Sequence, residues 1–222
     1  GTYRFGKPKA ARMNIEKPCS VVILISGSGS NLQALLEKSK QPGSAFHISA
    51  VISNKAEALG LQRAERSGVS THVIRHTDFD SRESFDQTLM QLIDSYEPNL
   101  VVLAGFMRIL TQDFTEHYHG RMMNIHPSLL PKHKGLNTHQ RAIDAGDTEH
   151  GCSVHFVTNE LDGGPIIVQA STTISTDDDA NSLAYKVLKL EHQIYPLAVP
   201  WYAAGRLRLQ QQGVVLDGNT LP

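Results

Sequence analysis

Two short segments of the chain are apolar at nearly every position, and they restrict the folds that the sequence allows. Residues 19–25 read CSVVILI and residues 100–104 read LVVLA. A strand with one face in water alternates apolar and polar residues, whereas a strand covered on both faces is apolar throughout. We therefore expect both segments to be buried strands of a parallel sheet, with helices on both of its faces.

The neighbouring segments alternate between strand and helix patterns. Further strands are expected at residues 47–53, 72–74 and 121–126, and helices at residues 32–40, 57–66 and 80–96. Strands that alternate with helices give a parallel sheet joined by right-handed crossovers. The first half of the chain therefore predicts an α/β fold with a mostly parallel central sheet.

After residue 124 the pattern changes. We expect neighbouring antiparallel strands at residues 152–157 and 165–175, a helix at residues 179–195, and a terminal hairpin at residues 206–211 and 214–217. The helix is expected to break at Pro196, because proline removes a hydrogen bond and clashes with the preceding turn. No repeat or low-complexity linker divides the chain, so residues 13–222 are expected to form one domain with an antiparallel C-terminal extension.

Composition excludes several classes of function. The 222 residues are 40% hydrophobic and 19% charged, with a formal net charge of −1. No basic excess indicates nucleic-acid binding, and no apolar segment reaches membrane-spanning length. Cys19 and Cys152 fit neither a metal site nor a disulfide framework, which favours a reducing, cytoplasmic location. Residues 1–12 lack the apolar centre of a signal peptide and are interpreted as a disordered leader or cloning remnant.

Asn124 and His126 end the strand expected at residues 121–126. They are two positions apart, so their side chains project to the same face of an extended chain. The ends of strands in open α/β sheets are where ligands bind. An amide donor beside an acid–base group suits a reaction that builds negative charge on a carbonyl oxygen. The alternative is a polar strand end with a hydrogen-bonded histidine.

A glycine-rich turn, residues 26–31 (SGSGSN), follows the first strand. It differs from a dinucleotide-binding fingerprint, because the third glycine is replaced by Leu32 and no acid follows the second strand. The backbone N–H groups of a helix N-terminus favour a single phosphate. Ser30 and Asn31 are suitable as further donors or as helix caps. The turn is therefore either a phosphate site or a plain strand–helix connection.

Five motifs in this order resemble the glycinamide ribonucleotide transformylase family of folate-dependent formyltransferases. They are SGSGSN at 26–31, VVLAGFMRIL at 101–110, NIHPSLLP at 124–131, HFV at 155–157 and LDGGP at 161–165. The resemblance implies a Rossmann-like formyltransferase fold. It also implies transfer of a formyl group from 10-formyltetrahydrofolate to the amine of glycinamide ribonucleotide, the third step of de novo purine synthesis.

The resemblance carries functional positions over to this chain. The residues matching the family's catalytic trio are Asn124, His126 and Asp162. The positions matching its ribonucleotide site are Gly29, Ser30, Asn31, Leu188, Lys189, Leu190 and Glu191. The positions matching its folate site are Arg82, Met107, Arg108, Ile109, Leu110, Asn124, Thr158, Asn159, Glu160, Leu161 and Asp162. A phosphate-binding half would thus extend to about residue 120, followed by a catalytic and folate-binding half. One departure is Asn137, where similar enzymes often have histidine.

The implied chemistry needs no covalent enzyme intermediate. Attack by the amine makes a tetrahedral oxyanion, to which Asn124 and a protonated His126 can donate hydrogen bonds, and one such donor is worth roughly 3 kcal/mol. Asp162 would keep His126 charged, and it could accept the proton of the amine. The glycines at 163–164 permit a tight turn that could bring this carboxylate back to the strand end. Eleven histidines are present, but their spacing fits no zinc motif, so no metal is expected.

Each position also has a structural interpretation when it is taken alone. Asp162 is typical of a turn, residues 106–110 are typical of a core, and Glu191 of a solvated helix face. Their joint match to one family outweighs these separate interpretations.

Three other functions are alternatives to formyl transfer to glycinamide ribonucleotide. A formyltransferase for another amine, such as initiator tRNA or an amino sugar, shares the trio, but the tRNA enzyme should carry a further basic domain. A 10-formyltetrahydrofolate hydrolase usually has an extra N-terminal domain. A non-catalytic binding module has no need of all three catalytic residues. We therefore expect two small-molecule substrates and neither nucleic acid nor membrane as a partner, and the sequence leaves an oligomer open.

Overall fold

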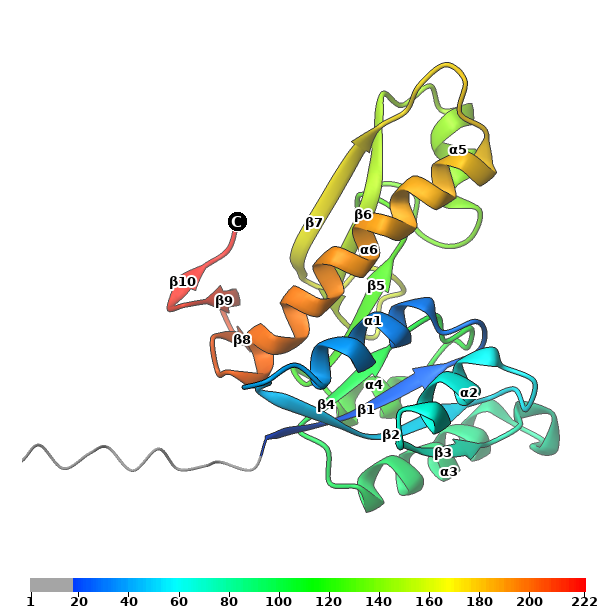
Figure 1. Cartoon of the computed structure of the whole chain (residues 1–222), viewed down its shortest axis with the longest axis vertical. Helices are drawn as coiled ribbons and strands as arrows, with labels where there is room; N and C mark the ends of the chain where they lie inside the picture. Colours follow the sequence, from blue (N-terminus) through cyan, green and yellow to red (C-terminus); the bar gives the residue numbers. More distant parts are fainter. Residues whose placement is uncertain (1–17) are drawn as a thin grey trace, which may run out of the picture.

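A seven-stranded sheet forms the centre of the computed structural model, which describes residues 18–222 (Figure 1). Its order is β3-β2-β1-β4-β5-β6-β7. The strands are β1 (Cys19–Ile25), β2 (Phe46–Ser53), β3 (Ser70–Val73), β4 (Leu100–Leu103), β5 (Met122–His126), β6 (Glu149–Phe156) and β7 (Ile166–Thr173). The first five pair in parallel, whereas β6 and β7 are antiparallel. The expected mostly parallel sheet is confirmed, and the interpretation of residues 1–12 lies outside the described part.

Helices cover both faces of the sheet (Figure 1). They are α1 (Ser30–Ser39), α2 (Leu59–Arg66), α3 (Arg82–Ser95), α4 (Gln112–His117), α5 (Thr138–Asp144) and α6 (Ala180–Ala203), with a 3₁₀ turn η1 (His76–Asp78). Strand β1 contributes core residues to both faces of the sheet. Ile23 packs in a cluster with α1, α2 and α6, while Leu24 packs in a second cluster with α3 and α4. This double coverage explains why β1 is apolar at nearly every position.

The C-terminal residues form a separate three-stranded antiparallel sheet, drawn in red at the end of α6 (Figure 1). It contains β8 (Leu207–Gln210), β9 (Gly213–Leu216) and β10 (Asn219–Thr220). Leu207 and Val214 pack into the same core cluster as α6. The expected terminal hairpin is confirmed, and β10 adds a third strand that the sequence pattern did not indicate.

The expected break at Pro196 is wrong, because α6 continues through Pro196 and Pro200 to Ala203. A proline inside a helix costs about 3 kcal/mol. The last turns nevertheless bury Tyr195 and Val199 completely, and burial of one large apolar side chain stabilises by about 1.5–3 kcal/mol. The Tyr195 hydroxyl also lies 2.7 Å from the carbonyl oxygen of Leu103 and donates a hydrogen bond to it. Packing against the sheet therefore outweighs the missing hydrogen bonds.

Among the described residues, no helix combines the length and the apolar character needed to cross a bilayer.

Candidate active site

The expected catalytic trio meets at the end of β5. Asn124 and His126 belong to this strand, and Asp162 lies in the loop after β6. His126 Nδ1 lies 3.5 Å from Asp162 Oδ1, and each of these two side chains is only 8% exposed. Asn124, which is half-buried, pairs with His155 on the neighbouring strand β6. The chain therefore brings an imidazole, a carboxylate and an amide to one strand end.

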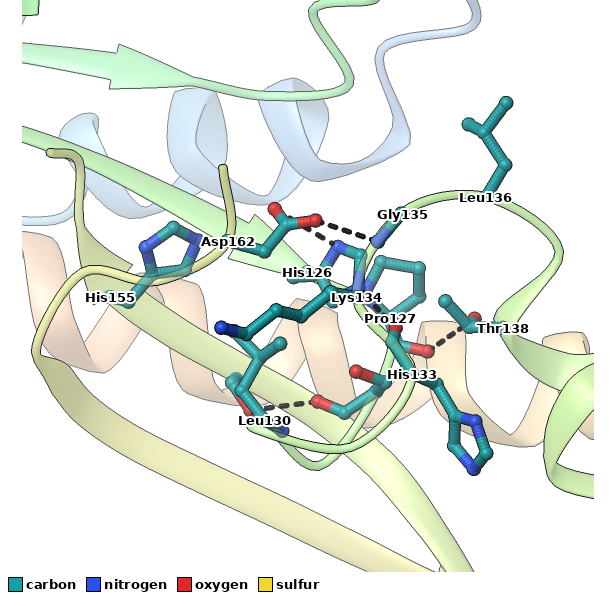
Figure 2. Close-up of polar contacts among 12 residues, drawn as sticks. His126, Pro127, Leu130, His133, Lys134, Gly135, Leu136, Thr138, His155 and Asp162 are labelled. Carbon is teal, nitrogen blue, oxygen red and sulfur yellow. Dashed lines mark hydrogen bonds and ion pairs between the residues drawn. The ribbon is translucent and has the colours of Figure 1, made fainter. Parts of the chain in front are cut away.

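Residues 133–135, which we call the strap, hold this pair from the other side (Figure 2). His126 Nε2 lies 2.9 Å from the carbonyl oxygen of His133, and the backbone N–H of Gly135 donates to Asp162 Oδ2 at 2.9 Å. A carbonyl oxygen only accepts, so Nε2 of His126 carries a proton. Nδ1 is therefore the nitrogen left for chemistry, and it faces Asp162. No sequence pattern indicates the strap.

Backbone geometry explains why glycine follows Asp162. A Cβ atom on Gly164 would lie 1.7 Å from the carbonyl oxygen of Phe156, so no other residue fits there without a shift of the backbone. Asp162 itself has a φ of 51°, in the left-handed region that aspartate tolerates better than most residues. Asp162 is thus a turn residue, and the same turn directs its carboxylate to His126.

His155 adds a buried imidazole next to Asn124. Its Nδ1 donates to the carbonyl oxygen of Phe156 at 3.0 Å, and its Nε2 is buried without a partner. Burial lowers the pKa of His155, which favours the neutral ring. The surroundings of Asn124 therefore include one uncharged imidazole in addition to the His126–Asp162 pair.

The glycine-rich turn and α6 meet at a second buried carboxylate. Asn31 Nδ2 donates to Glu191 Oε1 at 3.1 Å, although 160 positions separate the two residues. Glu191 is 8% exposed, so its interpretation as a solvated residue is wrong. Burial raises its pKa to about 7, and the hydrogen bond from Asn31 offsets only part of this rise. The opposite amide atom, Asn31 Oδ1, is buried without a partner.

A cavity of about 220 Å³ lies at the turn, and its lining consists of Gly27, Ser28, Gly29, Ser30, Asn31, Ala104 and Gly105. Gly29 precedes α1 with a φ of 72°, and a Cβ there would lie 2.6 Å from Cα of Gly60. Arg63 donates from Nε to the carbonyl oxygen of Ser28 at 2.7 Å. A guanidinium group therefore lies against the turn, although α2 carries no motif that would indicate it.

The segment between β4 and α4 has two different sides. Met107 and Ile109 are 61% and 54% exposed, whereas Phe106 and Leu110 pack against the core. Arg108 turns inward and places its guanidinium 5.1 Å from the centre of the Phe85 ring. Exposed and packed residues thus alternate along this segment, because it is extended, and the ligand wall stays a prediction.

The remaining expected positions differ in their surroundings. Arg82 is exposed at the start of α3. Lys189 stacks on the ring of Tyr185 at 4.3 Å, Leu190 packs against the core, and Leu188 is half-buried. In the loop after β6, Asn159 and Leu161 are exposed, Thr158 is half-buried, and Glu160 pairs with Lys134 of the strap at 3.2 Å. The structure thus brings Glu191 and Asn31 together and leaves Lys189 directed along its own helix.

Asn137 precedes α5 with a φ of 56° and makes no side-chain cap. Asparagine adopts this left-handed conformation more readily than most residues, which gives a backbone reason for its presence there. Within residues 18–222, no group of three histidine, cysteine, aspartate or glutamate side chains is arranged to hold a metal ion.

The sheet order and the cluster of Asn124, His126 and Asp162 define a class, an α/β protein with an amide, an imidazole and a carboxylate at one strand end. The Formyl transferase family model matches residues 19–199, and the chain belongs to this family. The chain is 51% identical over 203 residues to phosphoribosylglycinamide formyltransferase of Escherichia coli K12, covering 91% of this chain and 96% of that protein. It is 42% identical over 200 residues to the human trifunctional purine biosynthetic protein adenosine-3, covering 90% of this chain and 20% of that protein.

Solved structures of formyltransferases have the same fold as this chain. The phosphoribosylglycinamide formyltransferase of Coxiella burnetii is 53% identical, superposes with a TM-score of 0.88, and is matched over 93% of this chain and 97% of its own. A glycinamide ribonucleotide transformylase of Symbiobacterium toebii is 39% identical with a TM-score of 0.86, over 89% and 93% of the two chains. The expected formyltransferase fold is confirmed.

Proposed function

We propose that this chain transfers the formyl group of 10-formyltetrahydrofolate to the amine of glycinamide ribonucleotide. The observation that carries the proposal is the buried His126–Asp162 pair at the end of β5, 3.5 Å apart, beside the amide of Asn124. The names of the relatives support the same reaction.

The ribonucleotide binds between the glycine-rich turn and Glu191 in this proposal. Backbone N–H groups at the start of α1, with the Ser30 hydroxyl, receive the phosphate. The Arg63 guanidinium beside the turn adds positive charge. The Glu191 carboxylate accepts hydrogen bonds from the hydroxyl, amide and amine groups that the ribonucleotide offers, and Asn31 holds it in place.

The folate lies against the exposed apolar residues. A flat pterin ring needs apolar walls and a few backbone hydrogen bonds. Met107 and Ile109 offer such a wall, and Leu161, which is 56% exposed, offers another. In a crystal soaked with a folate analogue, the ring should touch both segments, and density for the ring elsewhere would refute this assignment.

The proposed reaction uses the Asn124 amide, His126 Nδ1 and the Asp162 carboxylate. The amine attacks the formyl carbon and forms a tetrahedral species whose oxygen becomes negative. The Asn124 amide and His126, protonated at Nδ1, donate hydrogen bonds to this oxygen. Asp162 accepts the proton of the amine, directly or through water. Collapse of the intermediate breaks the bond to the folate nitrogen, which takes up the proton that Asp162 accepted from the amine and leaves, so the carboxylate is restored.

One assay tests the proposal against its rivals. The enzyme is supplied with 10-formyltetrahydrofolate, and loss of the formyl group is followed with glycinamide ribonucleotide, with another amine, and with water alone. Deformylation that depends on the ribonucleotide supports the proposal. Equal rates without any acceptor would indicate a hydrolase, and no turnover would indicate a binding protein.

A further inference from the structure

His133 is a strained residue whose backbone contacts the expected catalytic histidine. Its φ is 53°, a conformation that is uncommon for residues other than glycine. Strained residues persist where several contacts hold them, and they cluster at functional sites. The contact in question is the hydrogen bond from His126 Nε2 to the His133 carbonyl oxygen.

The side chain of His133 is held by an acid outside the trio. His133 Nε2 lies 2.6 Å from Asp147 Oδ2, and the two side chains are 14% and 13% exposed. Asp147 is itself anchored at the end of α5, where its backbone N–H donates to the Ala142 carbonyl oxygen at 3.1 Å. The hydrogen bond from His133 lowers the pKa of Asp147, so the carboxylate stays ionised as this contact requires.

We propose that Asp147 and His133 are positioning residues that decide which nitrogen of His126 carries the proton. Asp147 fixes the His133 ring, the ring and the strained backbone direct the carbonyl oxygen, and this oxygen keeps the proton of neutral His126 on Nε2. Nδ1 is then the nitrogen that exchanges a proton beside Asp162. The inference rests on the proposed function in one respect, the use of His126 in the reaction.

A simple surface ion pair does not explain this arrangement. Exposed ion pairs contribute little to stability. Asp147 also forms such an exposed pair with Lys132, whose side chain is 63% exposed and whose Nζ lies 3.3 Å from Asp147 Oδ1. The His133 pair differs because it is nearly buried and its ring packs 6.2 Å from the ring of buried His150. The two pairs therefore provide a test and its matched control.

The test compares Asp147→Ala and His133→Asn with the control Lys132→Ala. Asparagine tolerates the left-handed backbone, so His133→Asn removes the imidazole while permitting the same φ. In both test variants we expect the ¹⁵N spectrum of neutral His126 to change from mostly Nε2-protonated to a mixture of tautomers. We expect kcat to fall about tenfold to a hundredfold, since misplacement by about 1 Å costs up to that much, with both KM values within about twofold.

Further measurements separate positioning from general damage. The double variant should be no worse than either single variant, because the two residues act in one chain of contacts. Asp147→Asn, which keeps an acceptor for His133, should restore most of the activity. An unchanged His126 spectrum in folded Asp147→Ala and His133→Asn would overturn the inference, as would equal losses in Lys132→Ala. The NMR result stands even if the wild type does not use glycinamide ribonucleotide, so the two proposals fail separately.

Discussion

Glu191 offers a prediction in which stability and function move in opposite directions. Burial raises its pKa from 4.5 to about 7, and each unit corresponds to 1.36 kcal/mol. The ionised carboxylate therefore costs the folded state about 3 kcal/mol at pH 8. Because the folded pKa is above the unfolded one, the wild type has its full stability below pH 4.5 and loses this contribution as the pH rises through 7. Glu191→Gln has no such loss.

The assay is urea unfolding of both proteins between pH 4.5 and 9. The free energy of unfolding of the variant, relative to the wild type, should rise steadily between pH 4.5 and 7, because the wild type loses stability there. Above pH 8 the difference should have grown by about 3 kcal/mol, or about 6–12 °C in Tm, on top of any difference that does not vary with pH. KM for glycinamide ribonucleotide should rise in the variant, and the wild-type KM should rise below pH 7 as Glu191 takes up its proton. The control Glu57→Gln changes an exposed side chain and should show no such pH dependence. A stability difference that does not vary with pH would refute the reasoning.

Three further changes separate the parts of the site. Asp162→Asn keeps an acceptor for Gly135 but removes the charge, so kcat should fall at least about a hundredfold with little change in KM; a near-normal kcat would leave Asp162 as a turn residue only. Gly29→Ala meets both the positive φ and the 2.6 Å approach to Gly60, so thermal unfolding should show a loss of at least about 1–2 kcal/mol. Ile109→Ser alters an exposed residue, so stability should change by less than about 0.5 kcal/mol while KM for the folate rises severalfold; an unchanged folate KM would remove Ile109 from the wall.

The sheet could be predicted from the sequence because burial on both faces leaves a local signal. Strand β1 was expected with its observed bounds, since every residue between Val21 and Ile25 is fully buried. Short elements left no such signal. Helix α4 has only six residues, and its start depends on Thr111, whose side chain accepts a hydrogen bond from the Phe114 N–H. The end of α6 was predicted wrongly because a local rule about Pro196 ignores the core that the helix covers.

The site was only partly predictable, for a physical reason. Asn124 and His126 follow from the chemistry of one motif and Asp162 from the family resemblance, whereas their surroundings depend on contacts between distant segments. Neither the 2.9 Å contact of His126 with the His133 backbone nor the burial of Glu191 beside Asn31 has a sequence pattern. A backbone acceptor carries no residue identity at all, so only the fold reveals it.

The two buried carboxylates show how the fold assigns different tasks to the same chemical group. Asp162 and Glu191 have equally small exposure, 8% for the side chain of one and 8% for the other residue. Asp162 faces an imidazole that can carry positive charge and accepts a backbone N–H, so its charge has partners. Glu191 has one neutral amide as its partner, and burial therefore dominates its pKa. A carboxylate short of donors gains most from a ligand that brings them, whereas one with donors already in place serves better as a fixed charge. Glu191 is accordingly suited to bind a substrate rich in hydroxyl and amide groups, and Asp162 to act on the histidine beside it.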